Sequence, residues 1–337
     1  MTDVSFFSRD DRTFQLFRSS WQIAARERAL EVRVVNRGFG PRNTWQAIRR
    51  FIAGAGSRRI VFGTSEICLY ALFAGPRDIY VFTGLGRLLL DDGIVARAVR
   101  LYLRWTYRRQ AVVVLNPQDQ ALIGDLLGTT PVLIDGEGYP FDTSQPAFAS
   151  RPSDGALTFA YVGRLLKSKG VDTLIAEFAR NASSHWTLLV VGDSDFSNPD
   201  ALTPDELRRL AQDTQGKIEY LGFRKDVREI LQGVDFLISL SRREGLPFSA
   251  LDGIDAGTHL ILSPVPGHLS FKDVAGVTFV ESDRLDRVFK QIASDPARFL
   301  DFDRIARRQS CDHKFGQASI VEAIQQLLVA PVGARGG

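Results

Sequence analysis

Short runs of β-branched and aromatic residues alternate with segments of helical periodicity along the whole chain, and this alternation constrains the fold most strongly. Such a pattern is typical of a parallel sheet covered by helices, and it argues against a β-sandwich or a helical bundle. The strands predicted in the first half are Val4–Ser8, Glu31–Val35, Ile60–Phe62, Ile79–Phe82, Val112–Leu115 and Val132–Ile134. Those predicted in the second half are Leu157–Val162, Trp186–Val191, Ile218–Leu221, Phe236–Leu240, Leu260–Leu262 and Val277–Val280.

The length of 337 residues predicts two domains, because one hydrophobic core rarely organises so long a chain. A stretch rich in Pro, Ser and Gly, Gln145–Gly155, has no hydrophobic period and is typical of a linker. We therefore predict two doubly wound α/β domains, residues 1–148 and 155–312, followed by a terminal segment, residues 313–337. Ligands of such paired sheets bind in a cleft at the carboxyl ends of the strands.

The composition indicates a globular protein, with 45% hydrophobic and 24% charged residues. No apolar run approaches the roughly 18–20 residues of a membrane-spanning helix, and the first residues lack a signal-peptide pattern. We expect a cytoplasmic protein. The two cysteines, Cys68 and Cys311, have no metal-ligand spacing, so we expect neither a disulfide nor a zinc site.

Positive charge is concentrated in the first 150 residues, which hold 19 Arg, no Lys and 14 acidic residues. One predicted helix in this part, Ala96–Gln110, carries arginines at helical spacing: Arg97, Arg100, Arg104 and Arg108. Aromatic residues lie among them: Tyr102, Trp105 and Tyr107. Residues 97–109 therefore indicate either peripheral contact with an anionic membrane or a solvated face whose aromatic rings pack inward. No pattern of a nucleic-acid-binding motif accompanies the charge.

The first motif with chemical content is Tyr161–Val171, which follows a predicted strand and opens a helix. Gly163 allows a turn there, and Arg164 and Lys169 are placed to bind a diphosphate from two sides. A solvated basic turn is the alternative interpretation of this stretch alone.

The second motif is Ser239–Gly257, in which a strand ends and a helix begins near Pro247. The free N–H groups of the helix start form an anion site. Glu244 and Asp252 are eight residues apart, so both carboxylates can face one ligand and accept hydrogen bonds from sugar hydroxyls.

Together these two motifs resemble the retaining glycosyltransferases of family GT4, which have the GT-B fold. The segment between them, Tyr220–Ser241, is similar to the family's connection in order and spacing, and Phe315–Leu328 resembles its terminal helix, which crosses back to the first domain. The resemblance implies that Arg164 and Lys169 bind the diphosphate, that Glu244 lies beside the transferred sugar, and that Asp252 binds the ribose. The family usually has Glu at that last position. The full donor site implied is Gly163, Arg164, Lys169, Gly222, Glu244, Gly245, Leu246, Phe248, Ser249 and Asp252.

The first half shows a weaker resemblance. Val81–Arg87 is similar to the Gly-Leu-Gly loop of family members that build bacterial exopolysaccharide or O-antigen, which implies an acceptor side at Thr83, Gly84 and Gly86. An ordinary tight turn is the alternative. Leu115–Asp119 resembles the family's Asn-Pro turn, whereas Ser8–Thr13 lacks the glycines of many relatives, and no histidine precedes His185. Of the four histidines, only His268 lies near the predicted cleft, where it could contact a ligand.

The resemblance implies a hexosyltransferase that takes a nucleotide-diphosphate sugar and extends a lipid-linked or oligosaccharide acceptor in polysaccharide or lipopolysaccharide synthesis. It implies no metal or other cofactor, and we name no general base. A sugar-nucleotide epimerase of the same fold and a non-catalytic sugar-nucleotide-binding protein remain open. A nicotinamide dehydrogenase ranks lower, because Gly54-Ala-Gly56 precedes a strand instead of following one.

Overall fold

The computed structural model describes residues 4–8, 19–38, 40–142, 156–194, 198–212 and 214–329. The chain forms two compact units, Met1–Pro140 with Asp312–Gly337, and Phe141–Cys311. The predicted linker, Gln145–Gly155, lies outside the described residues.

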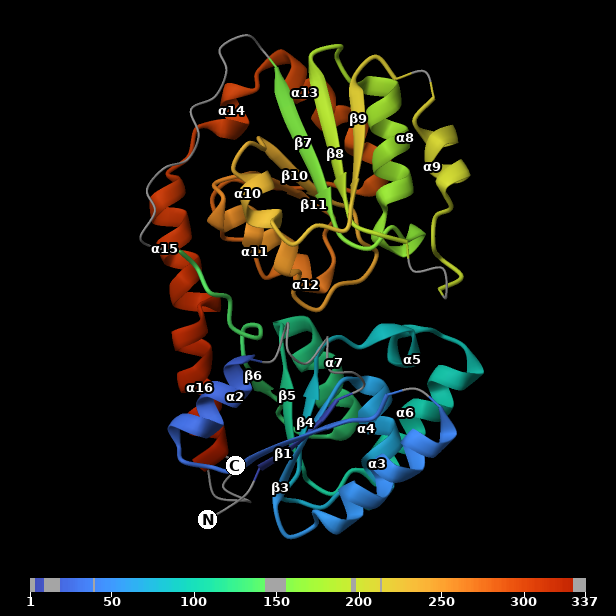
Figure 1. The fold of residues 1–337 in the computed structure, drawn as a ribbon, viewed down its shortest axis with the longest axis vertical. Coiled ribbons are helices and arrows are strands. Elements are labelled where there is room, and N and C mark those ends of the chain that lie inside the picture. The colour runs from blue at the N-terminus through green and yellow to red at the C-terminus, as the bar shows by residue number, and fades with distance from the viewer. Residues whose placement is uncertain are drawn as a thin grey trace. The chain divides into compact units, whose positions relative to one another are not determined.

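The first unit contains a six-stranded parallel sheet with the order β2-β1-β3-β4-β5-β6 (Figure 1). The β-branched and aromatic runs of the sequence form these strands, because their side chains pack well on a pleated surface. The strands are β1 (Val4–Ser8), β2 (Val32–Asn36), β3 (Arg58–Phe62), β4 (Ile79–Phe82), β5 (Ala111–Val114) and β6 (Val132–Leu133).

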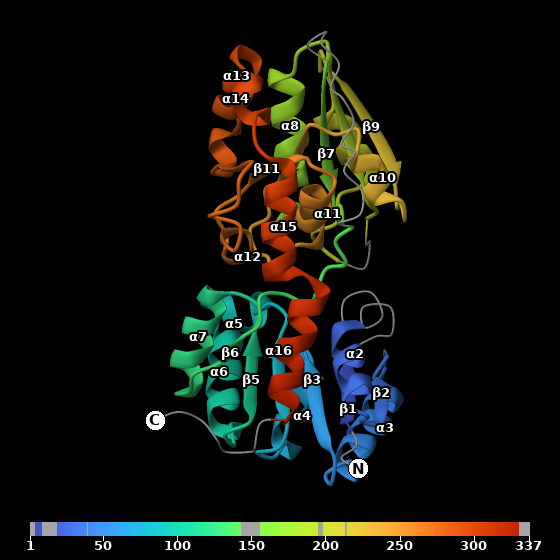
Figure 2. The ribbon, with the colours of Figure 1, turned by 90° about the vertical axis from the view of Figure 1, so that its left-hand side faces the viewer.

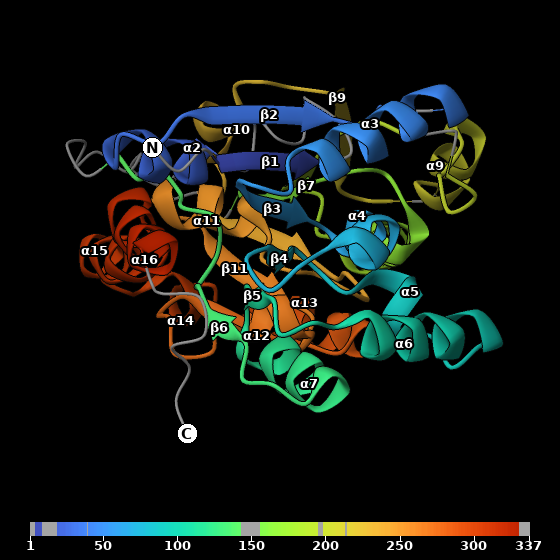
Figure 3. The ribbon, with the colours of Figure 1, turned by 90° about the horizontal axis from the view of Figure 1, so that it is seen from below.

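Helices cover both faces of this sheet, and alternate residues of each strand supply the two cores. Phe7 and Tyr80 face one helical layer, whereas Phe6 and Val81 face the other. The first layer comprises α3 (Pro41–Ala53), α4 (Thr64–Tyr70), the short helix η1 (Ala71–Phe73), α5 (Gly86–Leu90), α6 (Ile94–Thr106) and α7 (Pro117–Leu127). The second comprises α2 (Ser19–Glu27) and α16 (Gln317–Val329), which Figure 3 shows on the other side of the sheet from α3, α4 and α6.

The end of the chain contributes α15 (Arg304–Phe315) and α16, which Gly316 separates. Two backbone hydrogen bonds join this segment to Tyr139 of the first unit. Tyr139 N–H donates to Phe315 O at 2.8 Å, and Gln317 N–H donates to Tyr139 O at 3.0 Å. The sequence predicted one terminal helix from Phe315 to Leu328. The observed helix begins two residues later and packs against the first unit's sheet (Figure 2).

The second unit also contains a six-stranded parallel sheet, with the order β12-β11-β10-β7-β8-β9. This is the strand order of a Rossmann sheet. Its topological switch point, where the strand order reverses, lies between the first and fourth strands, here β7 and β10. The strands are β7 (Leu157–Val162), β8 (Trp186–Val191), β9 (Lys217–Gly222), β10 (Phe236–Ser239), β11 (His259–Leu262) and β12 (Val277–Phe279).

The helices of the second unit divide between its two faces. One core joins Phe159 and Phe236 to rings from the helices, including Phe178 and Phe289. On the other face, Gly253 packs directly against Leu237. The helices on the face of Phe159 and Phe236 are α8 (Val171–Asn181), α9 (Pro204–Leu210), α13 (Leu285–Ser294) and α14 (Ala297–Leu300). Those on the other face are α10 (Val227–Leu231), α11 (Phe248–Asp255) and α12 (Pro266–Leu269). Two short helices, η2 (Lys167–Lys169) and η3 (Ser282–Arg284), lie in loops.

Two parallel sheets wrapped by helices confirm the predicted α/β class. Four predicted strands have the observed bounds, and the others differ by one or two residues at one or both ends.

Candidate functional site

The two motifs predicted from the sequence follow adjacent strands of the second sheet. The first follows β7 and the second follows β10, and these strands pair in parallel through Phe159 with Phe236. Their loops therefore leave the same edge at the point where the strand order reverses, which is where open α/β sheets bind ligands.

The two loops are locked together through their backbones. Arg242 N–H donates to Ser168 O at 3.0 Å. A side chain on Gly170 would lie 2.7 Å from Leu240 Cβ, and the φ of Gly170 is +70°, so only glycine permits this approach.

Lys169 and Glu244 meet at this crossing. The Lys169 Nζ donates to Glu244 Oε1 at 2.6 Å, and Ser241 Oγ donates to the same oxygen at 2.8 Å. The Glu244 side chain is 16% exposed. Within the part of the chain that the structure describes, Oε2 has no partner, so this oxygen can accept a hydrogen bond from a ligand.

Arg164 lies on the β7 side of the crossing with an exposed side chain. Its carbonyl accepts a hydrogen bond of 2.6 Å from Tyr161 Oη, which fixes the turn that carries the guanidinium. Burial raises the pKa of Tyr161, so its hydroxyl stays a donor. Gly163 in this turn lies under Gly192, where a side chain would stand 2.8 Å from the Gly163 carbonyl carbon.

The helix start on the β10 side is α11. The helix begins at Phe248 and has Pro247 as its N-cap, one residue before the helical position predicted for Pro247. Pro247 makes no side-chain cap hydrogen bond, and the positive dipole end of the helix favours an anion. Gly245 and Leu246 precede it, Ser249 lies in its first turn, and all three are half-buried.

Asp252 lies one turn further along α11 and is half-buried. The structure therefore brings the predicted donor residues together at the β7–β10 edge, apart from Gly222. That glycine ends β9, two strands from β7, and its carbonyl accepts from Gly192 N–H at 2.8 Å. Gly222 is thus linked to the site only through the loop after β8.

The predicted acceptor residues lie in the first unit, at the carboxyl end of β4. Thr83 and Gly84 follow the strand, and Gly86 begins α5. The carbonyl of Gly84 accepts a 3.1 Å hydrogen bond from Thr64 Oγ1, at the start of α4. These residues are at the ligand-binding edge of their own sheet.

The Asn-Pro turn is a helix cap. Asn116 Oδ1 accepts from Asp119 N–H at 2.8 Å, and Pro117 occupies the first turn of α7. Burial raises the pKa of Asp119 to about 6, although the hydrogen bond from Asn116 opposes the shift.

The sequence did not identify several residues that build the donor site. Tyr161, Gly192, Ser241 and Gly267 support the loops from below, and nothing in their local sequence distinguishes them from core or turn residues. The expectation that His268 could contact a ligand is wrong. Its side chain is fully buried and is bonded to Ser239 and Ser263.

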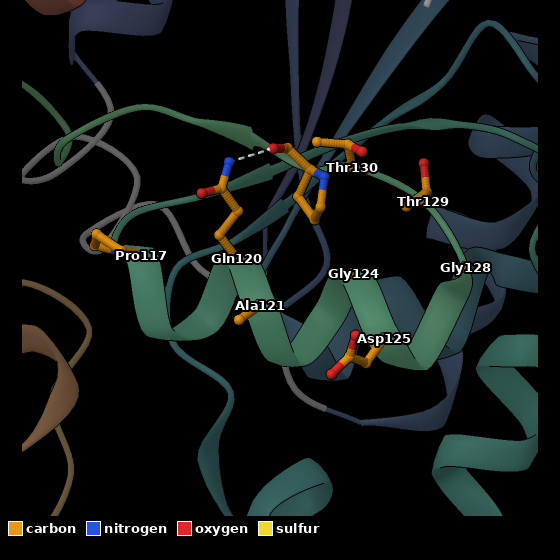
Figure 4. Close-up of a pocket in the computed structure, with 9 residues that line it drawn as sticks. Pro117, Gln120, Ala121, Gly124, Asp125, Gly128, Thr129 and Thr130 are labelled. Atoms are coloured by element: carbon orange, nitrogen blue, oxygen red, sulfur yellow. Dashed lines mark hydrogen bonds between the residues drawn. The ribbon is translucent and has the colours of Figure 1, made fainter. Parts of the chain in front are cut away.

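A separate open groove of about 470 Å³ lies between α7 and the chain that leads to β6 (Figure 4). Gln120 Nε2 donates to Pro131 O across it at 2.7 Å. None of the predicted site residues lines this groove. Among the described residues, no group of three His, Cys, Asp or Glu side chains is arranged to hold a metal ion, and no helix is long and apolar enough to span a membrane.

The stretch that contains both motifs is similar to a known protein family. Residues 156–294 match the family described as glycosyl transferases group 1. This stretch is therefore similar to the group 1 glycosyl transferases. It includes Arg164, Lys169, Glu244 and Asp252, and the match confirms the resemblance inferred from the sequence.

Two curated relatives each match part of the chain. The GDP-mannose:cellobiosyl-diphosphopolyprenol alpha-mannosyltransferase of Xanthomonas oryzae pv. oryzae (strain PXO99A) is 26% identical over 138 residues, 40% of this chain and 36% of that protein. The lipopolysaccharide core biosynthesis glycosyltransferase LpsE of Rhizobium meliloti (strain 1021) is 26% identical over 187 residues, 53% of this chain and 51% of that protein. The matches thus span only 36% and 51% of these relatives' lengths.

Solved structures match almost the whole chain. HepE of Anabaena, in complex with UDP, has a TM-score of 0.71 at 14% identity, with 97% of this chain and 99% of that chain covered. WaaG, a glycosyltransferase involved in lipopolysaccharide biosynthesis, has a TM-score of 0.70 at 14% identity, with 97% and 100% covered. These similarities confirm the predicted GT-B fold.

Proposed function

We propose that this protein transfers a hexose from a nucleotide-diphosphate sugar to a growing, lipid-linked glycan, with retention of the anomeric configuration. One observation carries the proposal: Lys169, Glu244 and the start of α11 converge at the switch point of a Rossmann sheet. The names of the relatives support it, because they include an alpha-mannosyltransferase that uses GDP-mannose and a lipopolysaccharide core glycosyltransferase.

The chemistry of the site fits departure of a nucleoside diphosphate. Arg164 and Lys169 supply two cations, and the N–H groups at the start of α11 supply aligned dipoles, so negative charge developing on the diphosphate is stabilised. No metal ion is needed for this role. Glu244 Oε2 would accept a hydrogen bond from a hydroxyl of the transferred sugar, and Asp252 would bind the ribose. In a front-face reaction the leaving phosphate takes the acceptor's proton, so no protein base is assigned.

Lys169→Ala and Glu244→Ala test the site. Both variants should lose transfer by at least about a hundredfold, the effect of removing one preorganised electrostatic partner. Lys167→Ala is a matched control, since Lys167 is two residues away and pairs with Glu206 on the surface. Transfer is measured with UDP- and GDP-sugars by product analysis. Near-wild-type turnover in both site variants would refute the assignment, and isomerised donor without a glycan product would identify an epimerase.

The acceptor side of the proposal includes contact with an anionic membrane through the first unit. Ten of the fourteen exposed large apolar side chains in the described residues lie in one helical layer, formed by α3, η1, α5, α6 and α7. In α6, Trp105 is 67% exposed, and Leu101 and Ile94 are also exposed. Arg97 and Arg104 lie between them with exposed side chains. Apolar side chains interspersed with arginines suit the headgroup region of an anionic bilayer.

The predicted alternative, an inward-packed aromatic face, holds only for part of α6. Tyr102 faces inward, where its hydroxyl donates to Cys68 O at 2.9 Å, and Arg100 is bonded to Leu89 O at 2.6 Å. Replacement of Arg97, Arg104 and Arg108 by Gln should therefore weaken sedimentation with phosphatidylglycerol vesicles. The control replaces three exposed arginines of the second unit by Gln: Arg180, Arg208 and Arg209. Equal loss in both triple variants would refute docking through α6.

A further inference from the structure

We propose that Ser241 is a positioning residue of the donor site. Its hydroxyl holds one oxygen of Glu244 so that the other faces the transferred sugar, and a buried cluster of Ser239, Ser263 and His268 holds Ser241 in place. The proposal rests on the proposed function for the identity of the ligand, but its structural claim concerns the protein alone.

The two oxygens of Glu244 have different surroundings. Oε1 accepts from Lys169 Nζ at 2.6 Å and from Ser241 Oγ at 2.8 Å, whereas Oε2 has no partner among the described residues. Lys169 is also a proposed phosphate ligand, so its ammonium is expected to turn toward a bound diphosphate. Ser241 would then be the remaining contact that fixes the carboxylate when the donor is present.

Ser241 itself is held by its backbone. Ser263 Oγ donates to the Ser241 carbonyl at 2.6 Å, and Ser263 N–H donates to Ser239 O at 3.0 Å. These contacts join the carboxyl ends of β10 and β11, directly beneath the loop that carries Glu244. Ser241 is 1% exposed, so its hydroxyl has little freedom to turn elsewhere.

His268 fixes the orientation of this cluster. Its Nδ1 lies 2.8 Å from Ser263 O, a group that can only accept, so Nδ1 carries the proton. The neutral ring then accepts at Nε2 from Ser239 Oγ, at 3.2 Å. Burial lowers the pKa of His268, which keeps the ring neutral and this tautomer in place. A buried polar group without a hydrogen-bond partner destabilises the fold, so the residues of the cluster are held in one arrangement.

The direction of the Ser241 hydroxyl distinguishes positioning from simple core packing. Ser239 and Ser263 satisfy groups inside the cluster, whereas Ser241 donates outward to the carboxylate of Glu244 at the proposed ligand edge. Its distance to Ser239 Oγ, 3.5 Å, is the longest in the cluster. The cluster therefore ends in a single strong hydrogen bond to Glu244.

Ser241→Thr and Ser241→Val form the matched test pair, because the two side chains have nearly the same shape and only Thr has a hydroxyl. Isothermal titration measures binding of GDP and UDP, and of GDP-mannose and UDP-glucose. The Val variant should bind the effective nucleotide sugar roughly 10- to 100-fold more weakly than the Thr variant, the range of a hydrogen bond to a charged group. Both should bind the bare nucleoside diphosphate equally. Equal sugar-nucleotide affinities for Thr and Val, or equal losses for sugar nucleotide and bare diphosphate, would overturn the proposal.

Crystal structures of the unliganded Thr and Val variants separate this inference from the proposed function. The Glu244 carboxylate should keep its position with Thr and change rotamer with Val. If the carboxylate is unchanged in the Val variant, Ser241 does not position it. If the wild-type protein binds none of these nucleotide sugars, the proposed function fails, while the rotamer comparison still decides whether Ser241 holds Glu244.

Discussion

The loop that carries Glu244 rests on the backbone of Gly267, and this contact provides a quantitative test of the donor site. A methyl group on Gly267 would lie 2.7 Å from the Gly245 carbonyl carbon and 2.8 Å from Glu244 O. Non-bonded carbons rest about 3.5–4.0 Å apart, so the loop would have to move by roughly 1 Å. The φ of Gly267 is not in the left-handed region, so alanine adds no backbone strain there.

A displacement of about 1 Å at a reacting group can lower the rate on the order of a hundredfold. We therefore expect Gly267→Ala to reduce kcat/KM for the nucleotide sugar by about a hundredfold, which corresponds to roughly 2.7 kcal/mol of transition-state stabilisation. Overpacking should also cost about 1–3 kcal/mol of stability, so kinetics are measured well below the melting temperature of the variant.

Gly233→Ala is the control for this experiment. It lies in the same unit, and the nearest atom to a methyl group there is Ile230 O at 3.9 Å. Circular dichroism and thermal melting should show both variants folded at the assay temperature. If Gly267→Ala retains kcat/KM within twofold of Gly233→Ala, the loop does not need its observed position, and the role assigned to Glu244 is refuted.

Three further changes follow from the buried polar groups. Burial raises the pKa of Asp119 from 3.8 to about 6, so the folded state holds this proton more tightly than the unfolded state, and stability is lost as the pH rises through about 6. Compared with the wild type, Asp119→Asn should therefore be about 1–3 kcal/mol more stable at pH 8 and nearly equal in stability at pH 4. Urea denaturation at the two pH values measures this difference. Tyr161→Phe removes the 2.6 Å hydrogen bond to Arg164 O, and it should weaken the binding of a nucleoside diphosphate about three- to tenfold. Titration calorimetry measures this affinity, and unchanged binding would show that Tyr161 does not support the turn. Asp78→Ala removes the carboxylate that pairs with the buried Arg59 and should destabilise the first unit by about 3–5 kcal/mol, measured by chemical denaturation. A loss below about 1 kcal/mol would show that the carbonyls of Phe51 and Phe73, to which Arg59 also donates, are sufficient partners.

The strands and the donor motifs could be predicted from the sequence because their signals are local. A β-branched run such as Trp186–Val191 shows a strand without reference to its neighbours, and Arg164 with Lys169 shows a cationic turn by residue type and spacing alone. Parallel neighbouring strands then bring their loops to one edge of the sheet. These features needed no knowledge of tertiary contacts.

The support of the site could not be predicted, because it depends on contacts between distant segments. Ser239 and Ser263 are single polar residues after apolar runs and become partners only because β10 and β11 pair side by side. The same limit applies to α6, where Tyr102 and Trp105 are three residues apart yet point inward and outward. A helical period gives the spacing of a face but not which face is buried.

Among the residues that the structure describes, the two sheets differ in the charge at their carboxyl edges, and this difference bears on the roles proposed for them. In the second unit, Arg164 is exposed and Lys169 shares a carboxylate that also faces the ligand edge. In the first unit, Arg37 follows β2 but is bonded through Nε and Nη2 to the buried Glu66, so its charge is neutralised within the protein. Thr64, at the start of α4, and Thr83, after β4, contribute neutral hydroxyls at this edge. An edge of this kind suits the hydroxyl groups of a glycan acceptor better than a diphosphate, because buried opposite charges leave little field to attract an anion. The charges of the described residues therefore favour the proposed assignment of the donor to the second unit and of the acceptor to the first.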